Sequence, residues 1–305
     1  MISVVVCSHN PRPAYFAKCL EALRWQTLPP GSWELMIVDN RSDTPLAKSI
    51  DLAWHSDARV IREEIQGLTP ARLRGIRESK GELLIFVDDD NVLDADFLET
   101  AQRIKEERPF LGSWSGQCRP AFEQIPPEWT RRYWGNLVIR EFDRDVWSNL
   151  PRLSASMPCG AGLCVRRTVA LHYLDLHQSG KRSLQLDRNG TSLLSGGDND
   201  LAACACDIGL GVALIATLKL THQISPERLT EDYLARLSEG IHFSSTVLDA
   251  EYGIGTSERT VLGHAADFLR MMRLPQPHRR ILRAAFRGRD RAMRHIRDAA
   301  IRPLR

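Results

Sequence analysis

Short apolar runs alternate with segments of helical periodicity over the first hundred residues of the chain. Continuous apolar runs are typical of strands covered on both faces, whereas apolar residues three and four apart are typical of helices. The predicted strands are Ile2–Val6, Leu35–Val38, Arg59–Ile61 and Leu83–Val87. The predicted helices are Phe16–Leu23, residues 46–54, a segment with Thr69 as N-cap and Pro70 in its first turn, and a segment capped by Asp94 or Asp96. This alternation predicts an α/β fold with a mostly parallel, Rossmann-like sheet flanked by helices.

The periodicity changes twice in the rest of the chain. Residues 110–156 hold a Pro126-Pro127 pair and show little periodicity, which predicts long loops or short antiparallel strands. The elements predicted next are helices near 167–178 and 199–208 and a strand near 211–216. After residue 225 the pattern is helical. We therefore expect a domain over residues 1–225 and a helical C-terminal region over residues 226–305.

Composition narrows the class of protein. Hydrophobic residues make up 43% and charged residues 26% of the 305, which is enough to form a packed core. No apolar stretch approaches the ~20 residues of a membrane helix, and the N-terminus lacks the basic region of a signal peptide. The seven cysteines include no CxxC pair, which favours a reducing cytoplasm. Residues 271–305 carry eleven arginines and two aspartates, a charge of +9, so the remainder of this +3 chain sums to −6.

Polar residues directly follow three of the predicted strands. Cys7-Ser8-His9-Asn10 follows the strand at 2–6, Asp39-Asn40 the strand at 35–38 and Asp88-Asp89-Asp90-Asn91 the strand at 83–87. Ligands of open α/β sheets bind at the carboxyl ends of the strands, so these residues are the candidates for a site. The Asp39 carboxylate is suited to a nucleobase edge or a ribose, and a simple turn residue accounts for it equally well.

The run Asp88–Asp90 has two interpretations. Three adjacent carboxylates repel one another unless a cation compensates, and carboxylate oxygens suit Mn²⁺ or Mg²⁺ together with substrate phosphates. A bound metal would neutralise the charge that develops on a diphosphate leaving group. The other interpretation is a solvated acidic turn that caps the next helix.

Three further positions also have both a functional and a structural interpretation. Gly196-Gly197-Asp198-Asn199-Asp200 precedes an apolar helical run, so Asp198 or Asp200 is either a general base in a cleft or a helix cap. Arg72, in a first helical turn, either pairs with a carboxylate such as Asp39 or is an exposed charge. His222 is either a ligand for a metal such as Mn²⁺ or a structural histidine.

Together these segments resemble family 2 of the inverting glycosyltransferases, which have the GT-A fold. The matching segments are Val5–Pro11, Leu35–Ser42, Gly67–Ile76, Phe86–Asn91 with the Asp-x-Asp motif, and Gly197–Leu201, which is similar to the later acidic motif. The resemblance covers about residues 1–225. The first position of the later motif, usually Glu, is Gly197 here.

The resemblance implies a role for each matched residue. Nucleotide-sugar binding falls to Ser8, Asn10, Asp39, Arg72, Asp88 and Asp89, and metal binding to Asp88, Asp90 and His222. Asp198 takes the place of the catalytic base, with Asp200 as the alternative, and Gly160, Ala161 and Gly162 would shape the acceptor side of the cleft. The implied reaction is a metal-dependent single displacement that inverts the configuration of the sugar. The donor is a nucleotide-sugar, UDP-linked by analogy, and the acceptor is a carbohydrate or is lipid-linked.

The arginine-rich segment 276–305 predicts a basic helix with an apolar stripe of Leu282, Phe286, Met293, Ile296 and Ala300. Such a helix either lies on an anionic membrane at the inner face or packs on the protein, at a homo-oligomer contact for example. We expect no nucleic-acid partner, because the sequence shows no nucleic-acid-binding fold and no interleaved aromatic residues.

Two other functions compete with a transferase. A sugar nucleotidyltransferase would carry a glycine-rich phosphate loop after its first strand, and Ser8-His9-Asn10-Pro11 is no such loop. The second alternative is a degenerate, non-catalytic nucleotide-sugar-binding protein. The presence of all the expected carboxylates argues against it, and a measurement of turnover separates it from a transferase. The sequence names neither the sugar nor the acceptor.

Overall fold

The structure is a computed structural model that describes residues 1–182, 186–255, 263 and 271–299. The strands are β1 (Ile2–Ser8), β2 (Trp33–Asp39), β3 (Ala58–Arg62), β4 (Leu83–Asp88), β5 (Asn91–Leu93), β6 (Leu111–Phe122), β7 (Val146–Ser148), β8 (Leu163–Arg166) and β9 (Gly211–Ile224). The α-helices are α1 (Pro13–Arg24), α2 (Leu68–Glu78), α3 (Phe97–Glu107), α4 (Arg167–Gln178), α5 (Gly197–Asp207), α6 (Glu231–Glu251) and α8 (Gln276–Asp298). Short 3₁₀ segments are Pro30–Ser32, Leu46–Lys48, Glu128–Leu137 and Pro226–Leu229.

The chain divides into two compact units. The first comprises Met1–Ala121, Val138–Leu184 and Gly197–Ile224. The second comprises Phe122–Leu137, Gln185–Gly196 and Ser225–Arg305. Two segments that the sequence pattern assigned to the larger domain, 122–137 and 185–196, therefore belong to the second unit.

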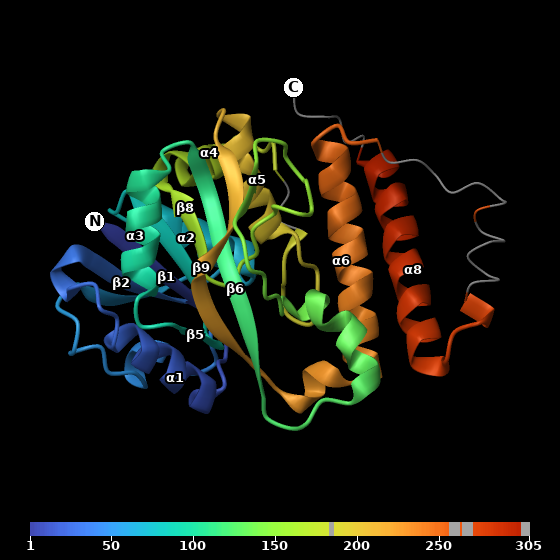
Figure 1. Cartoon of the computed structure of the whole chain (residues 1–305), viewed down its shortest axis with the longest axis horizontal. Helices are drawn as coiled ribbons and strands as arrows, with labels where there is room; N and C mark the ends of the chain where they lie inside the picture. The colour runs from blue at the N-terminus through green and yellow to red at the C-terminus, as the bar shows by residue number, and fades with distance from the viewer. Residues whose placement is uncertain (183–185, 256–262, 264–270, 300–305) are drawn as a thin grey trace. The chain divides into compact units, whose positions relative to one another are not determined.

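The first unit is built on one sheet with the strand order β3-β2-β1-β4-β8-β6-β9-β5 in the described part of the chain, and β7 pairs with β9. Strands β3, β2, β1 and β4 are parallel, and β8 joins β4 in the antiparallel sense. Parallel strands need crossovers, and α1 and α2 lie in the crossovers between them (Figure 1).

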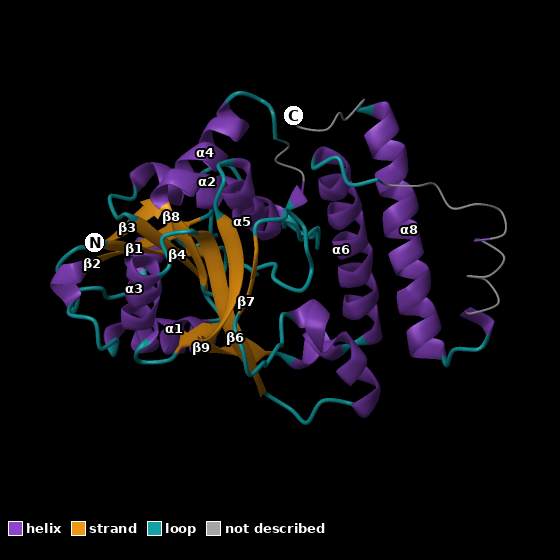
Figure 2. Ribbon diagram, turned by 45° about the horizontal axis from the view of Figure 1, so that its top comes forward, coloured by secondary structure: helices purple, strands orange, loops and turns teal. Residues whose placement is uncertain are grey.

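Helices cover both faces of this sheet (Figure 2). Alternate residues of β1 point to opposite faces. Val4 and Val6 share a buried cluster with Phe16 of α1 and Phe97 of α3. Val5 points the other way, where a Cβ on Gly75 of α2 would meet it at 2.5 Å. Helices α4 and α5 pack beside each other, and α2 packs against α4. The predicted α/β arrangement with flanking helices is confirmed.

Three predicted elements are corrected. Residues 46–54 form only the 3₁₀ turn Leu46–Lys48, because local bonds such as Ala53 N–H to the Asp51 carboxylate at 2.8 Å compete with a helix. Helix α2 has Gly67 rather than Thr69 as its N-cap, and the positive φ of 135° at Gly67 suits glycine.

The third correction concerns Leu111–Phe122, which forms one long strand, β6, instead of long loops or short strands. A Cβ on Gly116 would lie 2.1 Å from the Leu218 carbonyl oxygen of β9. The absence of a side chain at Gly116 therefore permits close packing inside the sheet.

The second unit contains the helix pair α6 and α8. Gly288 of α8 lies against Glu239 of α6, where a Cβ would be 2.2 Å from the Glu239 carbonyl oxygen. The 3₁₀ segment Glu128–Leu137 is joined to α8 by a 2.8 Å hydrogen bond between Tyr133 Oη and His278 Nδ1. No helix among the described residues is long and apolar enough to cross a membrane.

The predicted apolar stripe of α8 is wrong for Leu282, Phe286 and Met293, whereas Ile296 packs against a buried cluster that includes Phe243 and Val247 of α6. The buried residues of this helix are Ile281, Ala284, Ala285, Gly288 and Ala292, whereas Leu282, Phe286, Met293 and Ile296 are only partly buried. The stripe's last member, Ala300, and the rest of segment 276–305 beyond residue 299 lie outside the described residues. Small side chains face α6 because the two helices approach closely at Gly288.

Candidate functional site

The register of the parallel strands brings three polar strand ends together. Ser8 at the end of β1 pairs with Asp39 at the end of β2. On the other side of β1, Cys7 pairs with Asp88 at the end of β4. The side chains predicted to bind a nucleotide-sugar therefore start from one edge of the sheet, at the carboxyl ends of its strands.

Asp39 is nearly fully buried, with 1% of its surface exposed. Its carboxylate accepts hydrogen bonds from the backbone N–H of Ser42 at 2.9 Å and of Leu46 at 3.1 Å, and from Arg62 Nη1 at 2.9 Å. Burial alone would raise the pKa of Asp39, but these bonds and the Ser42 hydroxyl outweigh burial and hold the pKa below its usual value. The ion pair of Asp39 is with Arg62, not with Arg72 as considered from the sequence.

The loop after β1 is tied to its neighbours on both sides. The Ser8 hydroxyl donates to Asp89 Oδ2 at 2.5 Å. Asn10 has a positive φ of 48°, donates from its backbone N–H to Ser42 Oγ at 3.0 Å and from Nδ2 to Asp43 Oδ2 at 3.0 Å. These bonds hold the predicted nucleotide-binding loop against the loop after β2.

Asp90 and His222 are brought together by strand pairing. Asn91 of β5 pairs with His222 of β9, so the preceding Asp90 lies beside the histidine. His222 Nε2 is 3.3 Å from Asp90 Oδ2, and each residue is 6% exposed. Asn91 Nδ2 donates to Asp90 Oδ1 at 3.0 Å, which fixes the carboxylate.

The donor set at this position suits a hard cation in part. Asp90 supplies a carboxylate and His222 an imidazole nitrogen, and Asp88 stands two residues away with a partly exposed side chain. Over the described residues, no three His, Cys, Asp or Glu side chains come together as a complete metal-binding group. Mg²⁺-type sites commonly take one or two protein ligands and fill the rest with water and substrate phosphates, so the residues present fit a site of that kind.

The negative charge of the Asp88–Asp90 run reaches the neighbouring helix. Cys19 of α1 lies beneath it and donates from Sγ to the Asp88 carbonyl oxygen at 3.6 Å. Burial first, and then the charges of Asp89, Asp90 and Asp88, raise the pKa of the Cys19 thiol well above its usual value. The site therefore carries a concentrated negative potential in the protein alone.

Asp198 lies in the first turn of α5 and contacts the loop that precedes β8. Its Oδ2 accepts the backbone N–H of Gly160 at 2.6 Å. A Cβ on Gly160 would be 2.9 Å from Arg72 Nη2 and 3.2 Å from Asp198 Oδ2, so the guanidinium and the carboxylate flank this glycine. The structure thus brings together Asp198, Gly160 and Arg72, which the sequence assigned to three separate tasks.

The two neighbours of Gly160 have different surroundings. Gly162 has a positive φ of 65°, and a Cβ there would lie 2.7 Å from Leu220 and 2.8 Å from Phe97. Ala161 is 4% exposed and belongs to the buried cluster under the sheet. Of the three residues predicted to shape the acceptor side, Gly160 is the one beside the Asp198 carboxylate.

Asp200, the alternative base, is held differently. Its two carboxylate oxygens lie 2.9 and 3.1 Å from Arg182 Nε, and the Arg182 side chain is fully buried. Sequence reasoning missed both Arg62 and Arg182. Arg62 directly follows the predicted strand Arg59–Ile61, which was a usable signal, whereas Arg182 lies in a polar loop whose sequence gives no sign of burial.

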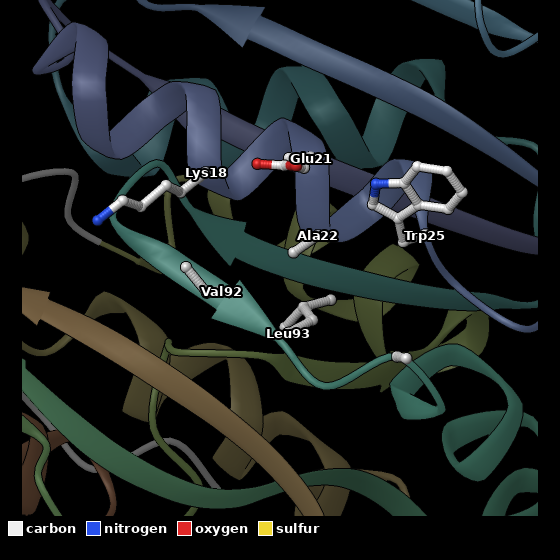
Figure 3. A pocket seen from close by; sticks show the side chains of 7 residues that line it. Lys18, Glu21, Ala22, Trp25, Val92 and Leu93 are labelled. Carbon is white, nitrogen blue, oxygen red and sulfur yellow. The ribbon is translucent and has the colours of Figure 1, made fainter.

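A shallow hollow of about 290 Å³ lies elsewhere on the first unit (Figure 3). Its lining residues are Lys18, Glu21, Ala22 and Trp25 with Val92, Leu93 and Ala95. None of the predicted site residues lines this hollow, so the carboxylates, not this hollow, mark the candidate active site.

A family model for glycosyl transferase family 2 matches residues 3–156, about half of the chain. The chain belongs to glycosyl transferase family 2. The match includes the ends of β1, β2 and β4 with Ser8, Asp39 and the Asp88–Asp90 run. The resemblance drawn from the motifs is confirmed.

Curated relatives match short segments. The glycosyltransferase AglE of Haloferax volcanii is 34% identical over 92 residues, which are 29% of this chain and 30% of AglE. An N-acetylglucosaminyltransferase of Bradyrhizobium diazoefficiens is 29% identical over 120 residues, which are 38% of this chain and 24% of that protein. The matches thus span less than a third of either relative.

Solved structures extend the similarity of fold to nearly the whole chain. Residues 1–349 of S. aureus TarS align with 98% of this chain and 83% of the TarS chain, at a TM-score of 0.56 and 14% identity. The same TarS fragment in complex with UDP-GlcNAc aligns with 82% of this chain and 70% of that chain, at a TM-score of 0.53 and 15% identity. The predicted GT-A type of α/β fold is confirmed.

Proposed function

We propose that this protein is a metal-dependent, inverting glycosyltransferase that moves a sugar from a UDP-linked donor to a hydroxyl group of a carbohydrate or lipid-linked acceptor. The observation that carries the proposal is the Asp198 carboxylate, bonded to Gly160 N–H at 2.6 Å beside the Arg72 guanidinium. The first turn of a helix and a neighbouring buried cation both favour the ionised carboxylate, which is the form that can accept a proton from an acceptor hydroxyl.

The donor side rests on the three strand ends. Asp39 and Ser8 lie next to each other in register, and Asp39 is ionised at neutral pH because its pKa is lowered. A carboxylate with fixed orientation is suited to accept a hydrogen bond from a uracil N–H. The TarS fragment, which has a similar fold, binds UDP-GlcNAc, and this supports a UDP-sugar as the donor.

Asp90 and His222, with Asp88 nearby, would hold the metal ion, which when bound neutralises charge on the diphosphate. Arg72, 3% exposed, adds a fixed positive charge on the side of Gly160. We assign to Asp88, Asp89, Ser8 and Asn10 the binding of the nucleotide-sugar, with the Asp88 carboxylate at the ribose or the metal. Asp89 is suited to this by its 2.5 Å bond from the Ser8 hydroxyl, which orients it.

The chemistry proposed for the chain's own residues is a single displacement. Asp198 accepts the proton of the acceptor hydroxyl, and the oxygen forms a bond to the anomeric carbon. The bond from that carbon to the diphosphate breaks, and its electron pair leaves with the nucleotide. Attack from the face opposite the leaving group inverts the configuration. Asp200 is a poor alternative, because its carboxylate is buried against Arg182.

In the proposal, the basic helix α8 has a structural role. Arg280 pairs with Asp232, and Arg287 and Arg291 pair with Glu239, both carboxylates lying on α6. With its buried stripe against α6, α8 packs as part of the second unit, and this supports the structural interpretation over binding to an anionic membrane. The cytoplasmic location stays part of the proposal, supported by seven free cysteines.

The test is nucleotide release from UDP-, GDP- and dTDP-sugars in the presence of Mn²⁺, Mg²⁺ or EDTA. We expect metal-dependent release of UDP, lowered ~10²–10⁴-fold by Asp198→Asn. Asp96→Asn is the matched control, because Asp96 is exposed and its side chain makes no capping bond to α3. Near wild-type turnover in a folded Asp198→Asn protein would overturn the assignment of the base, and donor binding without turnover in the wild type would favour a non-catalytic protein.

A further inference from the structure

The first turn of α5 presents three consecutive polar residues to different partners. Asp198 accepts from Gly160 N–H at 2.6 Å, and Asn199 Nδ2 donates to the Pro158 carbonyl oxygen at 3.0 Å. Asp200 receives Arg182 Nε at 2.9 and 3.1 Å. Successive helical residues are about 100° apart, so Asp198 and Asp200 point about 200° apart, toward nearly opposite sides of the helix. The rotation of α5 about its axis is therefore held from both sides.

Arg182 also reaches the other end of the same helix. Its Nη2 lies 3.8 Å from Asp207 Oδ2, and that oxygen is 3.6 Å from His172 Nε2 of α4. Asp200 and Asp207 are seven residues apart, which is about two turns, so they lie on one face of α5. A single guanidinium thus lies along this face and connects it with α4.

The burial of the Arg182–Asp200 pair indicates a role beyond stability. The Arg182 side chain is 0% exposed and that of Asp200 is 4% exposed. Removing two charges from water costs free energy that their attraction only roughly repays, and an apolar pair of the same size often stabilises a fold as well. What an apolar pair does not supply is the fixed direction of a charged hydrogen bond.

We propose that Arg182 is a positioning residue of the active site: by holding Asp200, it sets the rotation of the first turn of α5 and so aims the Asp198 carboxylate at Gly160 and the acceptor. Arg182 itself touches none of the reacting atoms. The proposal rests on the role of Asp198 in the proposed function, and it assigns a function to a loop arginine outside all the family motifs found in the sequence.

The test replaces both partners at once, Arg182→Met with Asp200→Leu, because removing one alone leaves a buried charge that destabilises the fold. Two readouts are compared with the wild type. The first is hydrogen exchange of the Gly160 amide, whose N–H is bonded to Asp198 and reports on the position of that carboxylate without any turnover. The second is kcat and KM for the donor, since a displaced base lowers kcat and leaves donor binding unchanged.

We expect the double variant to fold, to exchange the Gly160 amide at least ~10-fold faster and to lose ~10–100-fold in kcat at an unchanged donor KM, the scale of a misplaced reacting group. The control is Arg59→Met with Glu34→Leu, a second pair with a fully buried carboxylate, at 2.7 Å, located on β2 and β3 away from α5. We expect this control to lower stability while leaving Gly160 exchange and kcat as in the wild type.

The outcomes separate this proposal from the proposed function. An unchanged kcat in the double variant overturns the positioning role, and so does an equal loss of kcat in the control. If the wild type releases no nucleotide from any donor, the proposed function fails, and Gly160 exchange alone then decides whether Arg182 positions Asp198. If the double variant does not fold, Arg182→Lys, which keeps the charge and loses the geometry of the guanidinium, is measured for the same two changes.

Discussion

Replacing Gly160 with alanine probes the contact on which the proposed site depends. The added Cβ would lie 2.9 Å from Arg72 Nη2, 3.2 Å from Asp198 Cβ and 3.2 Å from Asp198 Oδ2. The backbone at Gly160 is outside the left-handed region, so the substitution introduces crowding and no backbone strain. The methyl group must therefore push the base, the guanidinium or its own loop by a few tenths of an ångström.

The Gly160→Ala substitution is expected to have a small effect on stability and a larger effect on activity. An arginine tip and a carboxylate in a partly exposed site adjust easily, so we expect Gly160→Ala to cost about 1 kcal/mol or less, at the low end of the overpacking range. The 2.6 Å bond from Gly160 N–H to Asp198 Oδ2 is directly disturbed. Loss of alignment between a base and its substrate is worth up to ~10²-fold in rate, so kcat is expected to fall ~10–100-fold.

The measurement is thermal melting together with kcat for UDP release, beside Gly31→Ala as control. Gly31 belongs to the same unit, has no positive φ and has no atom within 4 Å of the added Cβ. We expect the control to leave both quantities unchanged. A Gly160→Ala protein with wild-type kcat would refute the reasoning that this glycine is kept free of a side chain for the sake of Asp198 and Arg72. A loss of kcat that merely follows a large drop in melting temperature would refute it as well.

Three further predictions concern other parts of the molecule. Gly288→Ala places a Cβ 2.2 Å from the Glu239 carbonyl oxygen, so we expect a loss of roughly 1–3 kcal/mol in unfolding free energy by denaturant titration, with donor affinity unchanged by calorimetry. Burial first, and then the charge of Arg182, lower the pKa of His177 to about 4, whereas the unfolded chain binds that proton at about pH 6.5. Thermal melting should therefore show stability falling by about 1–2 kcal/mol between about pH 6.5 and 4, after allowance for partial exposure. The His177→Leu variant should lack this loss. Asp39, with its lowered pKa, contributes stability that is present above about pH 4 and lost as the pH falls through that lowered pKa, so Arg62→Met should move the acid-unfolding midpoint to higher pH.

The elements that the sequence predicts well are those whose residues carry their own signal. Strands β1, β2 and β4 are continuous apolar runs, and each begins and ends within two residues of its predicted bounds. The carboxylates at their ends follow from the topology, because parallel strands must end at one edge. The length of strand β6 was not predicted, since its glycines and serines have low strand propensity. The need for a small residue at Gly116 is evident only from Leu218 of β9, which packs on it.

The basic helix shows a second limit of pattern reading. Periodicity favours large apolar side chains, and therefore selects Leu282, Phe286 and Met293 as the buried stripe. In the structure α8 meets α6 through Ala284, Ala285, Gly288 and Ala292, because closely approaching helices need small residues at the contact. The hydrophobic pattern of one helix does not predict how closely the neighbouring helix approaches it.

The choice between Asp198 and Asp200 as the base depends on the three-dimensional structure and not on the sequence. Both are aspartates in the first turn of one helix, and the sequence offers each as a base or as a cap. Their difference comes from partners far along the chain: Gly160 for Asp198, and for Asp200 an arginine buried in a loop. Because a two-residue step turns the helix by about 200°, one carboxylate must face inward when the other faces the loop before β8. In our proposal, Asp198 is the base and Asp200, held by Arg182, aims it, so variants at the two positions should differ in kind. Asp198→Asn should lower nucleotide release ~10²–10⁴-fold in a protein that melts like the wild type. Asp200→Asn should lower the melting temperature and kcat together.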